Sequence, residues 1–259
     1  MAQKLMLKTL LKCPNSFVCS NFIKDKLLKE EKINSFAFCT GHIELDLLQS
    51  NYDISVFSNR YYVWEFWKCM INSAESVLDM AQYFHRTLTH LDIQYYRDKW
   101  LTSFEDPYER AALFYLLNRY SENGNFSLSE VNKNNLSYLN FISFERSMPA
   151  TQMLDLHLDK KKDFCDSFKK LDPSSVLLIP VGIQKNNFLI TKNVTTPETF
   201  EFDHKKMKEY VLSERQKAIL IYKYSDFTDK FFENKTYISK FGTVTENPEL
   251  AEDLIVSNF

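Results

Sequence analysis

The feature that most constrains the fold is a regular alternation of amphipathic and apolar segments toward the two ends of the chain. Helix-like and strand-like segments take turns over residues 20–32, 33–41, 42–50 and 52–58, and again over 160–171, 175–179, 203–216 and 217–224. Helical periodicity that alternates with short apolar runs is typical of strands joined by crossover helices. The pattern therefore predicts an α/β protein with a parallel, doubly wound sheet.

The middle of the chain has a different character. Residues 74–150 contain no convincing parallel strand and are rich in helical periodicity. In the best-defined helix, Asp106 is the expected N-cap and Pro107 the first helical residue. We therefore predict a sheet core formed by 1–73 and 151–259, interrupted by a mostly helical insertion of 74–150. The last segments, KTYISKFG and AEDLIVSNF, are typical of a closing antiparallel hairpin.

Composition and charge argue against several classes of function. The 32 basic and 34 acidic residues give a net charge of −2, which is not that of a protein binding nucleic acid through its overall charge. The five cysteines form no CxxC pair, so we expect a reduced, intracellular protein without metal. The frequent Asn, Lys, Phe, Tyr and Ile residues fit an AT-rich genome, so we expect this location to be the cytoplasm of a bacterium or of a phage- or virus-infected cell. No apolar run is long enough to span a membrane, and we do not expect the protein to bind a membrane.

Five short segments carry a resemblance to a known enzyme family. They are FCTG (38–41), FSN (57–59), RAALFYLLNRY (110–120), NGNFS (123–127) and EDLIVSNF (252–259). In this order they resemble the cofactor loop, the second-strand motif, the Leu-Asn-Arg helix, the recognition-hairpin turn and the last strand of the Dam-like DNA adenine-N6 methyltransferases. The resemblance covers nearly the whole chain. It implies a Rossmann-like S-adenosylmethionine-dependent methyltransferase fold in which the helical insertion corresponds to the target-recognition domain.

The position that corresponds to the catalytic motif is degenerate. The family's Asp-Pro-Pro-Tyr motif, at the end of a strand, falls here on Pro180, Val181, Gly182 and Ile183. In the family the acidic side chain and a proline carbonyl accept hydrogen bonds from the adenine amine, and the ring stacks on the flipped base. The four residues of this chain offer no side-chain acceptor and no ring. We therefore expect a catalytically inactive homologue, a pseudoenzyme.

The positions that resemble the cofactor site are degenerate in the same way. Phe38, Thr40 and Gly41 stand in the glycine-rich loop, so only one glycine remains for close approach of the backbone. Phe57, two residues before Asn59, stands where an acidic residue would accept hydrogen bonds from the cofactor ribose. The sequence therefore predicts that no cofactor binds.

Two functions remain open at this point. The first is a binding module whose cofactor crevice is closed by bulky groups, Phe57 and Ile183 among them. The alternative is a divergent but active DNA adenine-N6 methyltransferase that uses S-adenosylmethionine and takes its acidic residue from elsewhere, such as Asp172.

The resemblance also implies a surface for weak DNA binding. It consists of polar residues in and after the Leu-Asn-Arg helix: Arg110, Asn118, Arg119, Asn123 and Asn125. For the two arginines the alternative to a phosphate contact is an ion pair inside the protein.

A second surface is expected to contact protein. On a helix, Tyr61, Trp64, Glu65 and Lys68 share one side, which leaves the two aromatic residues near the surface. Exposed Tyr and Trp side chains are typical anchors of interfaces, so we expect them to support a homodimer or a protein partner. The alternative is that the helical insertion covers them.

Overall fold

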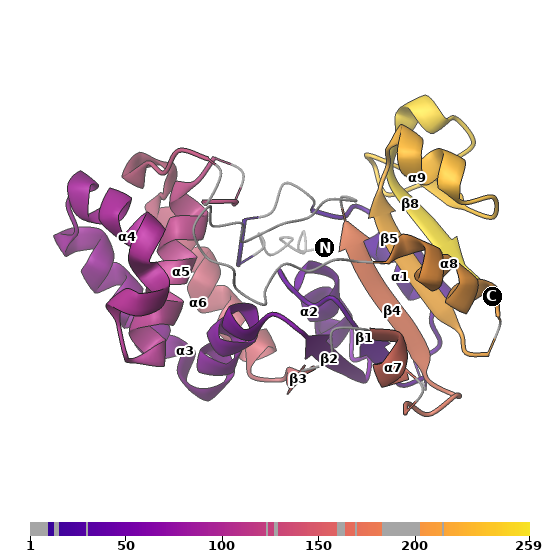
Figure 1. Ribbon diagram of the computed structural model, residues 1–259, viewed down its shortest axis with the longest axis horizontal. Coiled ribbons are helices and arrows are strands. Elements are labelled where there is room, and N and C mark those ends of the chain that lie inside the picture. The colour runs from indigo at the N-terminus through magenta and orange to yellow at the C-terminus, as the bar shows by residue number, and fades with distance from the viewer. Residues whose placement is uncertain are drawn as a thin grey trace, which may run out of the picture. The chain divides into compact units, whose positions relative to one another are not determined.

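The computed structural model describes residues 10–12, 16–29, 31–122, 124–126, 129–159, 164–168, 170–182, 203–213 and 215–259. These residues fall into two compact units (Figure 1). The helical unit comprises 10–12 and 61–153, and the sheet unit comprises the described residues of 16–60, 154–182 and 203–259.

The sheet unit is built on a mostly parallel sheet of eight strands in the order β3-β2-β1-β4-β5-β8-β6-β7. Their bounds are β1 Ile33–Ser35, β2 Ile54–Ser58, β3 Asp155–Leu158, β4 Val176–Gly182, β5 Ala218–Lys223, β6 Thr236–Ser239, β7 Val244–Thr245 and β8 Ala251–Ser257. Strands β3, β2, β1, β4 and β5 are mutually parallel, whereas β8 runs antiparallel to both β5 and β6. The predicted parallel sheet and its closing antiparallel hairpin are confirmed, and the strand order is compatible with a Rossmann-like fold.

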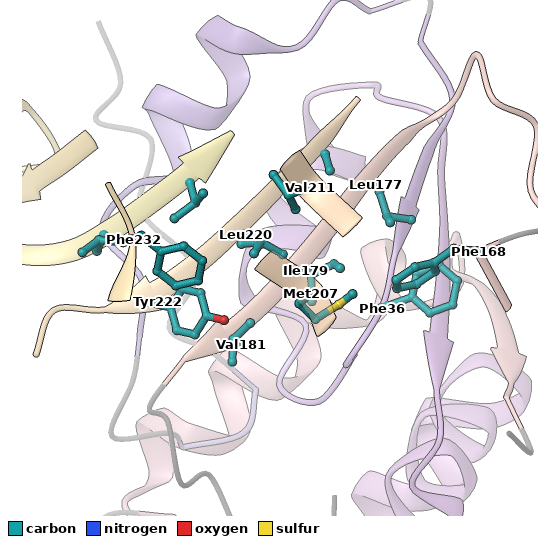
Figure 2. Packing of buried hydrophobic residues seen from close by; sticks show 13 residues of the cluster. Phe36, Phe168, Leu177, Ile179, Val181, Met207, Val211, Leu220, Tyr222 and Phe232 are labelled. Carbon is teal, nitrogen blue, oxygen red and sulfur yellow. The ribbon is translucent and has the colours of Figure 1, made fainter. Parts of the chain in front are cut away.

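The helices of the sheet unit follow the predicted alternation. They are α1 Ser20–Lys26, α2 His42–Gln49, α7 Phe164–Phe168, α8 His204–Leu212 and α9 Asp226–Phe231, with the short 3₁₀ helix η2 Pro248–Leu250. Phe168 from α7 and Met207 and Val211 from α8 pack on alternate residues of β4 and β5, such as Leu177 and Leu220 (Figure 2). The intervening residues Val176, Leu178, Ile219 and Ile221 are buried as well. Burial on both faces explains why β4 and β5 read as continuous apolar runs.

The helical unit contains α3 Tyr61–Thr87, α4 His90–Ser103, α5 Pro107–Tyr120, the 3₁₀ helix η1 Lys133–Asn135 and α6 Tyr138–Thr151. Helix α3 is kinked at Ser73, whose backbone is not helical. Asp106 caps α5 by accepting a hydrogen bond from the amide of Tyr108, as predicted. Within the described ranges, every helix is too short or too polar to cross a membrane.

Two strand boundaries and one whole strand differ from the sequence-based expectation. Strand β1 ends at Ser35, not near residue 41, because the chain enters a loop with a left-handed residue at Ala37. Strand β4 continues through Pro180 to Gly182, because a break in its register with β5 accommodates the proline. Strand β3 was not predicted at all. Its four residues, Asp155–Leu158, alternate between exposed and half-buried, as befits an edge strand with little apolar signal.

The boundary between the two parts also lies elsewhere. The sequence placed the helical insertion at 74–150, whereas the compact unit runs from Tyr61 to Met153. The whole of α3, including its aromatic first turns, belongs to the helical unit because it packs along α5 and α6.

Candidate functional site at the carboxyl ends of the parallel strands

The order of the strands indicates where a ligand would bind in a sheet of this kind. In an open, doubly wound sheet, ligands bind outside the carboxyl ends of the strands, at the point where the strand order reverses. Here β2 and β3 lie on one side of β1, and the later strands β4 and β5 lie on the other. The candidate site is therefore formed by the loop 36–41, which follows β1, and by the end of β4.

The loop 36–41 is tied to its neighbouring strands by backbone hydrogen bonds. The amide of Phe36 donates to the carbonyl of Leu178 on β4 (2.9 Å), and the amide of Phe38 donates to the carbonyl of Phe57 on β2 (3.2 Å). Two residues of the loop have positive φ angles, Ala37 at 58° and Gly41 at 68°. The second of these precedes the first residue of α2. A left-handed alanine costs about 1–2 kcal/mol, so the loop keeps its shape against a local preference.

Aromatic rings from four elements meet beside this loop, and we call them the aromatic stack: Phe36, Phe57, His157 and Phe168. The rings of Phe36 and Phe57 are parallel, with centroids 4.5 Å apart and an interplanar angle of 5°. His157 of β3 stacks on the other side of Phe57, with centroids 4.8 Å apart. Phe168 of α7 meets Phe36 edge-on at 4.6 Å. Phe36 is fully buried and lies beside Phe168 in Figure 2.

The other residues that resemble the cofactor site have ordinary surroundings. Phe38 is buried, and Thr40 and Asn59 are half-buried. The guanidinium of Arg60, which sequence reasoning did not single out, donates to the sulfur of Cys39 at 3.5 Å. Among the described residues, no cluster of three or more His, Cys, Asp or Glu side chains is placed to hold a metal ion.

The end of β4 carries apolar groups only. Val181 is buried in the same cluster as Tyr222 of β5 (Figure 2). Pro180 is half-buried. Gly182 has a φ angle of 74°, so the backbone turns as the strand ends. Ile183 lies outside the described residues.

Asp172, the acidic residue considered for an active enzyme, lies at the opposite end of β4. Its carboxylate accepts a hydrogen bond from the amide of Ser174 (2.9 Å), within the turn that precedes the strand. Five residue steps from Val176 to Val181 span roughly 16 Å in a strand. The carboxylate of Asp172 is therefore too far from the carboxyl end of β4 to act there.

A buried carboxyl group lies near the end of β1, and sequence reasoning missed it. Glu44, in the first turn of α2, is 2% exposed, and one of its oxygens accepts a hydrogen bond from the hydroxyl of Ser35 (2.8 Å). Burial raises the pKa of Glu44 above its usual value of 4.5, although hydrogen bonds from Ser35 and from its own amide oppose the rise. The segment HIELDLLQ gave no signal for this, because Glu44 is one of two acids on an amphipathic helix.

The raised pKa of Glu44 has a consequence for stability. Because the folded protein binds this proton more tightly than the unfolded chain, the free energy of unfolding falls as pH rises from about 4.5 through the folded pKa. We expect Glu44→Gln, which keeps an acceptor for Ser35 and carries no charge, to be more stable than the parent at pH 7 and equal to it below pH 4.5. Urea unfolding across this pH range is the measurement. Glu75→Gln, which removes an exposed glutamate, is the control. A lower stability of Glu44→Gln at pH 7 would contradict the expectation.

Arg110 is engaged inside the helical unit. Its Nε and Nη2 donate to the two carboxylate oxygens of Glu65, at 2.9 and 2.7 Å. Its Nη1 donates to the carbonyls of Phe104 (2.8 Å) and Glu105 (2.7 Å). For Arg110, the structure therefore contains an ion pair with Glu65, which was the alternative to a phosphate contact.

The Leu-Asn-Arg segment at the end of α5 faces inward as well. Asn118 is fully buried, and its side chain bonds both backbone groups of Lys12 and the carbonyl of Gly124. Arg119 is 7% exposed and donates to the carbonyl of Leu10 at 2.6 Å. Of the asparagines beyond the helix, Asn123 lies outside the described residues and Asn125 is half-buried.

The predicted protein-contact residues lie in the first turn of α3. Tyr61 is 46% exposed, whereas Trp64 is half-buried, and their ring centroids are 5.8 Å apart. Glu65 shares this side of the helix with Tyr61, as predicted, but it is not exposed. Glu65 is 6% exposed, because it forms the ion pair with Arg110 and accepts a hydrogen bond from the hydroxyl of Tyr61 (3.1 Å).

Comparison with models of known protein families and with curated proteins finds no match to this sequence.

Proposed function

We propose that the protein is a catalytically inactive homologue of the Dam-like DNA adenine methyltransferases that acts as a binding module. The observation that carries this proposal is the aromatic stack. A nucleotide-type cofactor at the switch point needs close approach of the backbone and an acceptor for its ribose hydroxyls. In this chain the ends of β1 and β2 instead carry Phe36 and Phe57, whose rings pack on each other. The residues present do not fit S-adenosylmethionine.

The strand order supports the relationship to methyltransferases. The resemblance implies a parallel sheet whose last strand, the segment EDLIVSNF, closes the core. This segment contains most of β8, which runs antiparallel beside β5 and lies between β5 and β6. The support concerns the scaffold, because a fold by itself does not determine a function.

A protein partner is favoured over DNA as the target. The side chains predicted to contact DNA form hydrogen bonds inside the helical unit, as seen for Arg110, Asn118 and Arg119. Few of their donor groups therefore remain for phosphates. Large apolar side chains are exposed on the same unit: Tyr61, Tyr83, Leu91, Tyr95, Tyr138 and Leu139. Exposed tyrosines are frequent anchors of protein interfaces.

The test of the proposal is the thermal shift caused by S-adenosylmethionine. A ligand present at 1000 times its dissociation constant stabilises a protein by about 4.1 kcal/mol, which corresponds to roughly 8–16 °C for a chain of this size. We expect 1 mM S-adenosylmethionine to raise the melting temperature by about 1 °C or less, because the dissociation constant is millimolar or weaker.

S-Adenosylhomocysteine serves as the second ligand in this test, because it lacks the transferable methyl group and the positive charge. A shift of roughly 8 °C or more with either ligand would indicate micromolar binding. That result would favour the active enzyme over the binding module.

A further inference from the structure

The helical unit contains a pocket that is separate from the strand ends. It lies between α3 and α6, has a volume of about 170 Å³ and is lined by Gln82, His85, Arg86, Tyr138 and Phe141. Phe141 is buried, whereas Tyr138 is 75% exposed and Arg86 is exposed. The pocket therefore has a covered aromatic side and an accessible side that carries a cation.

The volume and the lining suit one flat ring. An apolar cavity of about 150 Å³ can hold a benzene ring, whereas pockets for drug-sized ligands start at about 300 Å³. The ring of Phe141 meets that of His85 edge-on, with centroids 5.6 Å apart. A ligand ring would have aromatic partners in Phe141, His85 and Tyr138, and such contacts favour another aromatic group.

The hydrogen bond of His85 determines which of its nitrogens can donate. Its Nδ1 lies 2.9 Å from the hydroxyl of Tyr120, which is fully buried. Among the described residues, this hydroxyl has His85 as its one hydrogen-bond partner. A buried hydroxyl hydrogen needs an acceptor, so Tyr120 donates to Nδ1 and the hydrogen of the neutral imidazole resides on Nε2. His85 therefore offers a donor to a bound ligand.

The electrostatic surroundings of His85 are positive. Burial lowers the pKa of His85 most, and the charges of Lys133 and Arg86 lower it further. Arg86 also donates a hydrogen bond to the side-chain oxygen of Gln82 (3.4 Å). Because this oxygen is engaged, Gln82 offers its NH₂ group, a donor, to a ligand. The polar groups around the pocket are thus mainly donors, and the charge beside it is positive.

We propose that this pocket binds a small anion carried on one flat ring, with the ring against Phe141 and Tyr138 and the anionic oxygens on Arg86 and Nε2 of His85. The chemistry is that of an aromatic carboxylate or of a pyrimidine mononucleotide. The inference does not depend on the proposed function, because the pocket shares no residue with the aromatic stack.

The experiment is a fluorine NMR titration of the full-length protein with 4-fluorobenzoate. We expect a dissociation constant of about 1 mM or lower, which is reasonable for a ligand of about ten non-hydrogen atoms. Arg86→Met should weaken binding about tenfold and Tyr138→Ala about fivefold. Both side chains are exposed, so neither substitution should unfold the protein.

The matched controls are Arg146→Met and Tyr95→Ala, which remove exposed residues that do not line the pocket. They should bind the probe like the parent protein. Displacement of the probe by thymidine 5′-monophosphate would assign a nucleotide as the natural kind of ligand, and its failure would assign a carboxylate. Three results would overturn the proposal. They are no binding of 4-fluorobenzoate at 10 mM, unchanged affinity of Arg86→Met for this probe, and equal affinity of the parent protein for neutral 4-fluorobenzamide.

Discussion

Asp253→Asn is expected to lower the free energy of unfolding by about 3–5 kcal/mol, the usual cost of removing one partner from a buried ion pair. Asp253 is fully buried on β8, and its Oδ1 lies 2.7 Å from the ammonium of Lys223 on β5. Its Oδ2 accepts hydrogen bonds from the amides of Val18 (2.6 Å) and Cys19 (3.0 Å). The substitution keeps the size of the side chain and removes its charge.

Three groups would lose the carboxylate of Asp253 in this variant, namely the ammonium of Lys223 and the amides of Val18 and Cys19. Burial acts to lower the pKa of Lys223, but the charge and hydrogen bonds of Asp253 and Glu252 outweigh it, so the pKa is raised. The stabilisation by this lysine is complete below its usual pKa of 10.5 and is lost as the pH rises through the folded value. At neutral pH the asparagine would therefore leave the amides of Val18 and Cys19 without a carboxylate, and the charged lysine would keep only its pair with the half-exposed Glu252 among the described residues.

Glu252→Gln is the matched control, because Glu252 is the other acidic partner of Lys223 (2.9 Å) and its side chain is 48% exposed. An exposed pair contributes about 0–1 kcal/mol, so this variant should unfold almost like the parent. Urea unfolding followed by circular dichroism measures both variants, and hydrogen exchange of β8 peptides locates the loss in the sheet unit. Equal stabilities of the two variants would show that the buried pair contributes little.

Much of the fold could be predicted from local patterns in the sequence. Strands β4 and β5 are buried on both faces, so their continuous apolar runs were unambiguous. Helix α5 was predicted from its cap at Asp106 and from Pro107. Strand β3 was missed because Asp155 and His157 are exposed at an edge, where apolar periodicity is weak. Apolar periodicity indicates which residues are buried, so it predicts exposed segments such as β3 poorly.

The candidate site could be predicted only in part, because it depends on contacts between distant segments. The sequence indicated that Phe57 replaces an acceptor, but not that Phe36 and His157 stack on its two sides. Asp253 and Val18 are 235 residues apart, and no spacing rule connects them. The resemblance assigned Asn118 and Arg119 to a DNA surface, whereas both face the interior of the helical unit. A motif identifies residue types, and the packing determines what these residues contact.

Asn118→Ala is the second substitution with a large expected effect. Its side-chain oxygen accepts a hydrogen bond from the amide of Lys12 (2.7 Å), and its nitrogen donates to the carbonyls of Lys12 and Gly124 (both 2.9 Å). Alanine would leave these three backbone groups without their partner, at about 1–3 kcal/mol for each group that stays buried. We expect the free energy of unfolding of the helical unit to fall by about 3 kcal/mol or more.

The surroundings leave little chance for the backbone to compensate. Gly124 has a φ angle of 84°, and a Cβ atom there would lie 2.0 Å from the carbonyl oxygen of Lys12, so the two backbones are in direct contact. The ammonium of Lys12 donates to the carbonyl of Ser121 (2.8 Å), just beyond α5. Without Asn118, the segment 10–12 would be held at this end of α5 mainly by Lys12 and Arg119.

Fluorescence can follow this unit separately, because all three tryptophans, Trp64, Trp67 and Trp100, lie within it. Asn135→Ala is the matched control, since that side chain makes one comparable bond, to the carbonyl of Tyr120 (2.6 Å), and should cost about 1 kcal/mol. Hydrogen exchange at the amide of Lys12 should accelerate in Asn118→Ala alone. If Asn118→Ala is instead as stable as the parent and binds DNA more weakly, the DNA-contact role implied by the resemblance holds. If Asn118→Ala is less stable but, while folded, binds DNA like the parent, the role of the motif is to stabilise the fold.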